Sequence, residues 1–192
     1  MNTTPKLLDK NSGLFWKNYY PQLVDLYIAA FSGLPWKMVL ERDYVEKRLF
    51  DHFSRATTQI LVSEKNKKIQ GATWFDQPTF EELSKMRGDD IVKFLQTKLR
   101  EEALEDYIWM RETLVSPQLQ RQGVGSSLRS SFNQYVAQNY PEGVLVLTRH
   151  REDNTGIIKI STINGFHRTG VKQQANIDGQ LIDNEFWYKI YK

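Results

Sequence analysis

The sequence contains no cysteine, and this absence excludes disulfides, thiolate metal sites and a cysteine nucleophile. Histidine is also scarce: the chain has only His52, His150 and His167. Their spacing does not match that of paired metal ligands, which usually lie close together along a helix or loop. We therefore expect no metal site and no acyl-cysteine chemistry.

Long hydrophobic runs and a dominant charge are missing too. No apolar run approaches the roughly 20 residues that span a membrane, and the start "MNTTPKLLDK" has no apolar segment of the signal-peptide type. The net charge is +3, and acidic and basic residues interleave along the chain. A nucleic-acid partner would favour clustered lysine and arginine. We expect a cytoplasmic protein that binds neither nucleic acid nor membranes.

The length and composition are those of one globular domain. With 192 residues and 40% hydrophobic content, the chain is long enough to bury a full core. We predict a single domain over residues 1–192, with a loose segment at 1–12. Residues 76–106 are charged and form a variable insert, which we expect to contribute to substrate choice because such segments carry specificity.

Hydrophobic periodicity predicts the elements of the N-terminal part. Residues 20–32 carry apolar side chains at helical spacing, and a second helix is predicted over 41–53. The segments either side of "EKNKK" in residues 57–75 are β-rich, so they predict an antiparallel hairpin. Gly71 lies inside the second strand, where glycine indicates a bulge or a close backbone approach.

The C-terminal part alternates strands with helices. Residues 107–115 and the unbroken apolar run 143–148 predict strands, with an amphipathic helix between them. A strand–helix–strand unit of this kind forms a right-handed parallel crossover. Residues 154–164 predict a short helix closed by Gly165, and 185–191 an aromatic last strand. The order predicts an α/β fold with a mixed sheet.

The stretch "LVSPQLQRQGVGSSLRSSF" (114–132) places two glycines and a run of donors where a helix begins. The first amides of a helix have no internal partner, and aligned peptide dipoles add positive charge there. Gly123 and Gly125 allow a tight turn and a close ligand approach. The side-chain donors are Gln120, Arg121, Gln122, Ser126 and Ser127. We interpret the stretch as a pyrophosphate cradle, the alternative being a glycine-containing loop without a ligand.

The spacing of this loop narrows the class of phosphate site. There is no G-x-x-x-x-G-K-[ST], and Leu128 stands where G-x-G-x-x-G needs its last glycine, so neither nucleotide fingerprint is present. The loop does match [QR]-x-x-G-x-[GA] at Gln120, Gly123 and Gly125. Downstream, "NTGIIKISTINGF" (154–166) begins with Asn and ends in Gly-Phe.

With both motifs, the sequence resembles the GCN5-related N-acetyltransferase (GNAT) family over roughly residues 20–192. The resemblance implies a mixed, mostly antiparallel sheet with a central parallel, splayed strand pair and helices on both faces. It implies acetyl-CoA as co-substrate, with the backbone of Leu114 and Val115 on the pantetheine arm and thioester. The pyrophosphate would be held by Gln120, Arg121, Gln122, Gly123, Val124, Gly125 and Ser126, and Asn154 would contact the cofactor arm.

One position departs from the family pattern. Counting back from Gly165 and Phe166, Ser161 stands where the resemblance implies a tyrosine that protonates the departing thiolate. A serine hydroxyl is a much weaker acid than a tyrosine, whose reference pKa is about 10. The identity of the general acid therefore stays open, with a nearby tyrosine or a water as alternatives.

Two residues are candidates for the general base that deprotonates the amine. Strand alternation places Glu112 on one face with Ile108, Met110 and Leu114, where an apolar setting would suit proton transfer. The alternative for Glu112 is an ion pair with a neighbouring Lys or Arg. His150 follows a buried strand at its carboxyl end and has a suitable reference pKa. Its alternative is an exposed loop position, and His52 and His167 favour structural or surface roles.

The favoured function is direct acetyl transfer from acetyl-CoA to a primary amine of a small molecule or peptide. The alternative is a non-catalytic acyl-CoA-binding regulatory module. Trp36, Tyr44, Trp74 and Trp109 are candidates for an acceptor wall or for core, and "REEALED" (100–106) for amine recruitment or a solvated helix face. The acceptor is not specified by the sequence, and the aromatic C-terminal strand is compatible with a homodimer.

Overall fold

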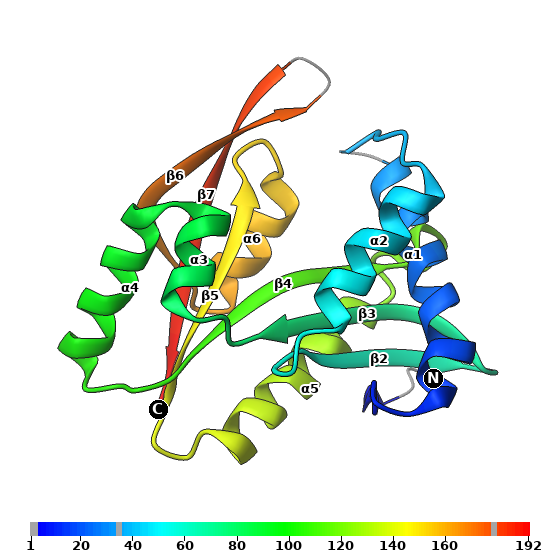
Figure 1. Cartoon of the computed structure of the whole chain (residues 1–192), viewed down its shortest axis with the longest axis horizontal. Helices are drawn as coiled ribbons and strands as arrows, with labels where there is room; N and C mark the ends of the chain where they lie inside the picture. The colour runs from blue at the N-terminus through cyan, green and yellow to red at the C-terminus, as the bar shows by residue number, and fades with distance from the viewer. Residues whose placement is uncertain (1–3, 34–35, 178–179) are drawn as a thin grey trace. The chain divides into compact units, whose positions relative to one another are not determined.

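A computed structural model describes residues 4–33, 36–177 and 180–192. Its seven-stranded sheet has the order β1-β2-β3-β4-β5-β7-β6 (Figure 1). The strands β4 and β5 pair in parallel, whereas β1–β2, β2–β3, β5–β7 and β7–β6 are antiparallel. The chain divides into two compact units: the part up to Asp76 with Arg111–Tyr135, and Gln77–Met110 with Val136–Lys192. Each unit is described separately.

The first unit contains a short first strand, three helical segments and a β-hairpin. Its elements are β1 (Lys6–Leu7), η1 (Phe15–Tyr19), α1 (Tyr20–Ser32), α2 (Arg42–Phe53), β2 (Gln59–Lys65) and β3 (Lys68–Asp76). The helices predicted over 20–32 and 41–53 are therefore confirmed, as is the hairpin. Residues 34–35, which follow α1, lie outside the described residues. The strand β1 and the π-helical turn η1 were not predicted.

The core of the first unit lies between α1, α2 and one face of the sheet. Leu23, Val45 and Leu49 are fully buried against Ile60 and Trp74, because the apolar stripes of both helices face the alternate positions of β2 and β3. Burial of each such aliphatic side chain contributes about 1.5–3 kcal/mol. These contacts fix the position of α2 on the sheet.

Both features predicted for Gly71, a bulge and a close backbone approach, are confirmed. The register passes from Ser63↔Gly71 to Glu64↔Ile69, which is a bulge in β3. A Cβ on Gly71 would lie 2.8 Å from the Val124 side chain and 2.9 Å from the Leu114 carbonyl oxygen. Only glycine leaves room for the first residue of α5 (Val124–Asn139) to lie directly on the sheet.

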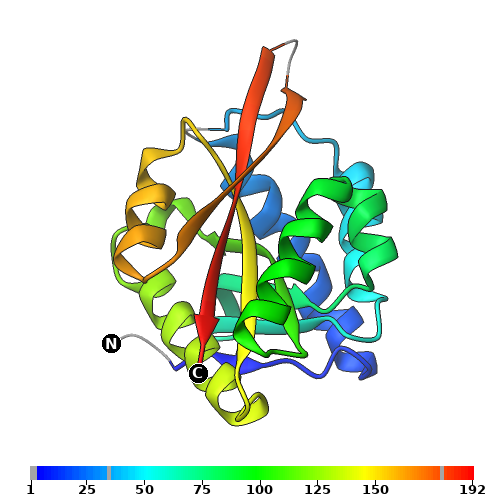
Figure 2. The same cartoon turned by 90° about the vertical axis from the view of Figure 1, so that its left-hand side faces the viewer.

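The second unit contains the insert and the C-terminal strands. Its elements are α3 (Phe80–Arg87), α4 (Asp89–Glu102), the start of β4 (Tyr107–Val115), β5 (Val144–Arg151), α6 (Thr155–Ile163), β6 (His167–Ile177) and β7 (Gln180–Tyr191). In α4, Ile91, Leu95 and Leu99 form an apolar stripe that is buried against Leu145 and Leu147 of β5. Figure 2 shows β6 and β7 as a long twisted hairpin beyond this core.

The end of α6 confirms the predicted glycine cap. Gly165 has φ +77°, its N–H donates to the Thr162 carbonyl, and the Phe166 N–H donates to the Ser161 carbonyl, both at 3.0 Å. This pair of bonds is the Schellman arrangement, which needs a left-handed residue at that position. The cap turns the chain sharply from α6 into β6.

The predicted fold class is confirmed: an α/β fold with a mixed sheet and one parallel strand pair, with helices on both faces of the sheet within each unit. The insert 76–106 contains two helices, separated at Gly88 with φ +89°. None of the described helices is long and apolar enough to cross a membrane. The single-domain assignment and the loose segment 1–12 stay predictions, although Lys6 and Leu7 lie in a strand.

Candidate active site

The predicted cradle has the geometry of a tight connection from a strand to a helix. The strand β4 ends at Val115, a short 3₁₀ turn spans Pro117–Leu119, and α5 begins at Val124. Between them, Arg121 has φ +62° and Gly123 has φ +86°. Two left-handed residues reverse the chain within one turn, so β4 leads directly to the amino end of α5.

The side chains and backbone of this loop suit an anionic ligand. Gln120, Arg121, Gln122 and Ser126 are exposed, whereas Val124 is buried against Gly71. A Cβ on Gly125 would meet only the Val115 side chain, at the ordinary contact distance of 3.6 Å. The first turn of α5 thus presents its amides and positive dipole end beside exposed donors, the arrangement that binds phosphate groups.

Strand β4 reaches this loop through Leu114 and Val115. Leu114 is buried in the core with Ala72 and Trp74, as the predicted alternation requires. The Ser116 N–H donates to the carbonyl of Gln70, the residue passed over in the β3 bulge, at 2.9 Å. This bond and the contact of Gly71 with Leu114 fix the end of β4 to β3.

Glu112 lies in a polar environment, which corrects the expectation of an apolar one. Its Oε1 lies 3.6 Å from Nη2 of Arg48 on α2, and the two side chains are 22% and 31% exposed. Arg48 Nε donates to the Tyr27 hydroxyl at 3.0 Å. The ion-pair alternative was therefore the right interpretation of the Glu112 surroundings, and its assignment as base stays a prediction.

Burial and the Glu112 carboxylate raise the pKa of Tyr27, so its hydroxyl keeps its proton across the neutral range. The charged form of Arg48 is likewise favoured, because the Glu112 carboxylate and the hydrogen bond to Tyr27 raise its pKa against the cost of burial. The Arg48 guanidinium therefore lies beside both the Glu112 carboxylate and the protonated phenol of Tyr27.

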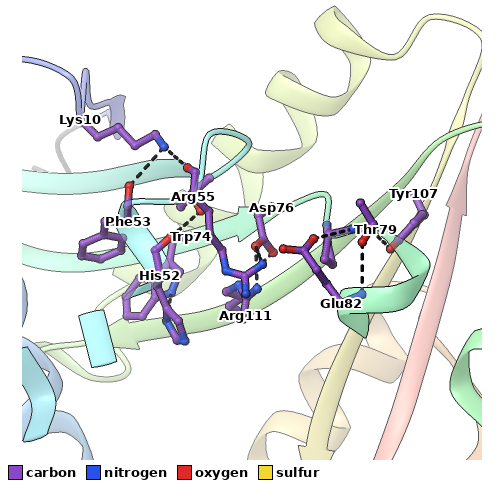
Figure 3. A network of polar contacts seen from close by, with 12 residues as sticks. Lys10, His52, Phe53, Arg55, Trp74, Asp76, Thr79, Glu82, Tyr107 and Arg111 are labelled. Atoms are coloured by element: carbon purple, nitrogen blue, oxygen red, sulfur yellow. Dashed lines mark hydrogen bonds and ion pairs between the residues drawn. The ribbon is translucent and has the colours of Figure 1, made fainter. Parts of the chain in front are cut away.

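The neighbouring residue, Arg111, forms a different kind of pair. Its Nε donates to Asp76 Oδ1 at 2.9 Å and its Nη2 to Oδ2 at 2.6 Å, and both side chains are almost fully buried. Arg55 Nη1 lies 4.0 Å from the same carboxylate (Figure 3). Lys10 donates to the carbonyls of Phe53 and Arg55. This network fixes β4 to β3 and to the end of α2.

In the second unit, two predicted catalytic residues contact each other. His150 Nε2 lies 2.7 Å from the Ser161 hydroxyl, and both side chains are buried. The His150 ring also lies beside Trp187, with centroids 5.7 Å apart. The exposed-loop alternative for His150 is thereby wrong, since the residue belongs to β5. Asn154 is the N-cap of α6, and its side chain accepts from the Ile157 N–H at 3.3 Å.

The remaining candidates favour structural roles. Trp74 and Trp109 are buried, so the core interpretation is confirmed for both. Trp36 packs on Phe31, and Tyr44 is exposed. His52 accepts a hydrogen bond from Trp74, and His167 is exposed. In the acidic run, Glu101 pairs with Lys98 and Glu102 with Lys192. Within residues 4–33, 36–177 and 180–192, no cluster of three potential metal ligands occurs.

Sequence reasoning missed Arg48, Tyr27, Asp76 and Arg111. Each belongs to a helix or strand whose periodicity was read only for its apolar positions. Arg48 follows Val45 and precedes Leu49, so it lies at the edge of the buried stripe of α2. The signal that could have identified Arg48 was a charged residue at the edge of the apolar stripe of a helix. Such a residue can pair with a charged residue on the strand that the stripe packs against.

No family model matches this chain, and no curated protein matches its sequence. Solved structures do match along the full length. A ribosomal-protein-alanine N-acetyltransferase from Brucella melitensis has a TM-score of 0.66 and 14% identity, covering 97% of this chain and 99% of its own. An acetyl transferase from Salmonella typhimurium that modifies the N-terminal serine of ribosomal protein L7/L12 has a TM-score of 0.65 and 14% identity, with 99% and 96% covered.

A third match is an acetyltransferase of the GNAT family from Streptococcus pneumoniae, with a TM-score of 0.60, 15% identity and 98% of both chains covered. At identities this low, the matches carry information on the fold alone. The structural similarity agrees with the mixed sheet and its parallel β4–β5 pair. The chain has the fold of the GCN5-related N-acetyltransferases.

Proposed function

We propose that this protein is an acetyl-CoA-dependent N-acetyltransferase, moving an acetyl group directly from the CoA thioester to a primary amine. The observation that carries the proposal is the turn from β4 into α5, with Gly123 in a left-handed conformation and Gly125 at the helix start, where a Cβ would meet only the Val115 side chain at an ordinary contact distance. Two structures with this fold are named for acetylating amino groups of ribosomal proteins, which supports the same reaction type.

The residues of the first unit fit the diphosphate of a CoA molecule. The amides at the start of α5 and the side chains of Gln120, Arg121 and Ser126 would bind it, since exposed donors at a helix start suit a charge that stays solvated. Backbone groups of Leu114 and Val115 would align the pantetheine arm. Acetyl-CoA supplies an activated acyl group, and a contact of Asn154 with the cofactor arm stays a prediction.

Glu112 is proposed to remove the proton from the acceptor ammonium. The residue lies two positions before Leu114 on β4, about 7 Å along a strand that rises 3.3–3.4 Å per residue. In the transfer, the amine nitrogen forms a bond to the acetyl carbon, the carbon–sulfur bond breaks, and the sulfur leaves with the electron pair. One ammonium proton goes to Glu112 before the attack, the nitrogen loses a second proton as the amide forms, and a proton taken up by the sulfur lets CoA leave as the thiol.

His150 and Ser161 are proposed to act together in proton transfer. The Ser161 hydroxyl is hydrogen-bonded to His150, so a proton delivered from this pair would come from the imidazole rather than from serine alone. The same contact favours the rival function, a non-catalytic acyl-CoA-binding module, because a buried serine replaces the family's tyrosine. The role of residues 76–106 in acceptor choice and a homodimer stay predictions.

The proposal is tested by measuring CoA thiol release and amide formation with acetyl-CoA and a panel of amines. Gly125→Ala is the matched control, because its Cβ meets only an ordinary contact. Gly125→Val fills the space where phosphate would lie, and it should reduce acetyl-CoA affinity at least tenfold in a protein that stays folded by circular dichroism. Equal acetyl-CoA affinity in the two variants would exclude the loop as the cofactor site.

A further inference from the structure

The Arg48–Glu112 pair differs from the Arg111–Asp76 pair in its contact distance. Its atoms lie 3.6 Å apart, beyond hydrogen-bonding distance, whereas Arg111 and Asp76 are joined by two bonds of 2.9 and 2.6 Å. The side chains of Arg48 and Glu112 are also partly exposed, whereas those of Arg111 and Asp76 are not. A ligand can therefore contact the first pair and not the second.

Arg48 has donors to offer such a ligand. A guanidinium carries five N–H groups, and among the described residues the hydrogen bond recorded for Arg48 is the one from Nε to Tyr27. The Tyr27 hydroxyl accepts that bond and keeps its own proton. The N–H groups of Nη1 and Nη2 form the planar fork that can bind both oxygens of a carboxylate.

Glu112 supplies the complementary charge on the adjacent strand. A ligand with an ammonium and a carboxylate on neighbouring atoms would place its ammonium on Glu112 and its carboxylate on Arg48, with each charge paired. A purely cationic amine would instead bring a second positive charge to Arg48, whose charged form is favoured by its surroundings. Such like-charge placement rejects polyamines, since specificity depends as much on repulsion as on attraction.

We propose that Tyr27, Arg48 and Glu112 form the acceptor site and that they select a zwitterionic amine, an α-amino acid with a free carboxylate. The proposal rests on the proposed function, because the ammonium held by Glu112 is the one that is acetylated. Tyr44, exposed one helical turn before Arg48 on α2, lies at the rim of this site.

The test compares free α-amino acids with their carboxamides as acceptors, together with spermidine as a polyamine. Each acid and its amide share the side chain and the amine, and differ in the carboxylate. The amine of the amide is the weaker base, so more of it is unprotonated at pH 8 and the comparison is biased against the proposal. We expect kcat/KM for the best acid to exceed that of its amide at least tenfold, with spermidine a poorer substrate than either.

The variants separate recognition from folding. Arg48→Gln should reduce the acid-to-amide ratio of kcat/KM to about one, through a higher KM for the acid. Arg48→Lys should retain part of the preference, and Tyr27→Phe should reduce it severalfold. If Arg48→Gln slows acid and amide equally, Arg48 is structural and the proposal is overturned.

The two proposals fail in different ways. Acetylation of spermidine or of amides in preference to acids would overturn the acceptor assignment while the acetyltransferase function stands. Absence of transfer to acids, amides and spermidine alike, in a protein that binds acetyl-CoA, would overturn both and favour the non-catalytic module.

Discussion

Arg111 and Glu112 are consecutive residues of β4, and each forms an ion pair, but the two pairs differ in physical character. Arg111 and Asp76 are buried and joined by two short hydrogen bonds, whereas Glu112 and Arg48 are partly exposed and 3.6 Å apart. A buried, fully satisfied pair contributes rigidity and has no capacity left for a ligand. A looser, accessible pair costs less to separate and can exchange partners. The difference suggests that the Arg111–Asp76 pair stabilises the structure and that the Arg48–Glu112 pair binds substrate.

The largest expected effect comes from breaking the buried pair. Asp76→Ala leaves the Arg111 guanidinium buried beside Arg55 without its carboxylate, and removal of one partner of a buried pair typically costs about 3–5 kcal/mol. We expect the free energy of unfolding, measured with urea, to fall by that amount. As the matched control, Arg48→Gln should lower it by about 1 kcal/mol or less, because that pair is partly exposed. Equal losses would show that the two pairs are alike.

The next effect concerns catalysis rather than stability. Glu112→Gln keeps the shape of the side chain and removes its ability to accept a proton, so turnover should fall by about 10²–10⁴, the usual contribution of a general base. The rise of rate with pH between pH 6 and 9 should flatten, and acetyl-CoA affinity should stay nearly unchanged.

His150→Gln is the comparison for Glu112→Gln, at saturating acetyl-CoA. Full turnover in Glu112→Gln together with a large loss in His150→Gln would identify His150 as the base. If neither variant loses activity, the amine's own unprotonated fraction supplies the nucleophile and the enzyme acts mainly by positioning its substrates.

A smaller effect on stability and acetyl-CoA binding is expected from a change at Gly71, which contacts neither ion pair. Gly71 lies against the end of β4 and the start of α5. Gly71→Ala places a methyl group 2.8 Å from Val124 and 2.9 Å from the Leu114 carbonyl, and overpacking of this kind costs about 1–3 kcal/mol. We expect lower thermal stability and weaker acetyl-CoA binding, because the start of α5 must shift. Gly125→Ala should be close to neutral for stability in the same melting experiment. Wild-type acetyl-CoA affinity in folded Gly71→Ala would show that cofactor binding does not depend on the packing of Gly71 against the start of α5.

The smallest expected effect on rate concerns the contact between His150 and Ser161 in the second unit. Ser161→Ala removes the hydroxyl that contacts His150 Nε2, and we expect less than a tenfold loss of turnover, since one hydrogen bond contributes about 0.5–1.5 kcal/mol. The free energy of unfolding should fall by about 1–3 kcal/mol, because His150 loses a buried partner. A thousandfold loss of turnover would instead place Ser161 in the proton transfer to CoA.

Most elements could be predicted from the sequence, because their signals are local. The apolar stripes of α1 and α2, the β-rich hairpin and the glycine cap of α6 each lie within one short segment. The loop from Gln120 to Ser126 was equally local, since a helix start and its glycines are adjacent in the chain. The short strand β1 was missed because two residues carry no periodicity.

The partners of the site residues could not be predicted in the same way. Glu112 was assigned an apolar setting from strand alternation, which describes β4 alone and contains no information on α2. The pairing of His150 with Ser161 depends on how α6 packs on β5, and that of Arg111 with Asp76 on the pairing of separate strands. Such contacts are set by tertiary packing, which a periodic pattern in one segment does not contain.

The most direct test of the proposed activity is a coupled count of products with isotopically labelled acetyl-CoA. Free CoA thiol is titrated while mass spectrometry measures the label on the acceptor nitrogen, for wild type, Gly125→Ala and Gly125→Val. The proposed mechanism predicts one thiol released for each amide formed, near-wild-type rates in Gly125→Ala, and loss of both products in folded Gly125→Val. Tight acetyl-CoA binding with neither product would contradict it and identify the chain as a binding module.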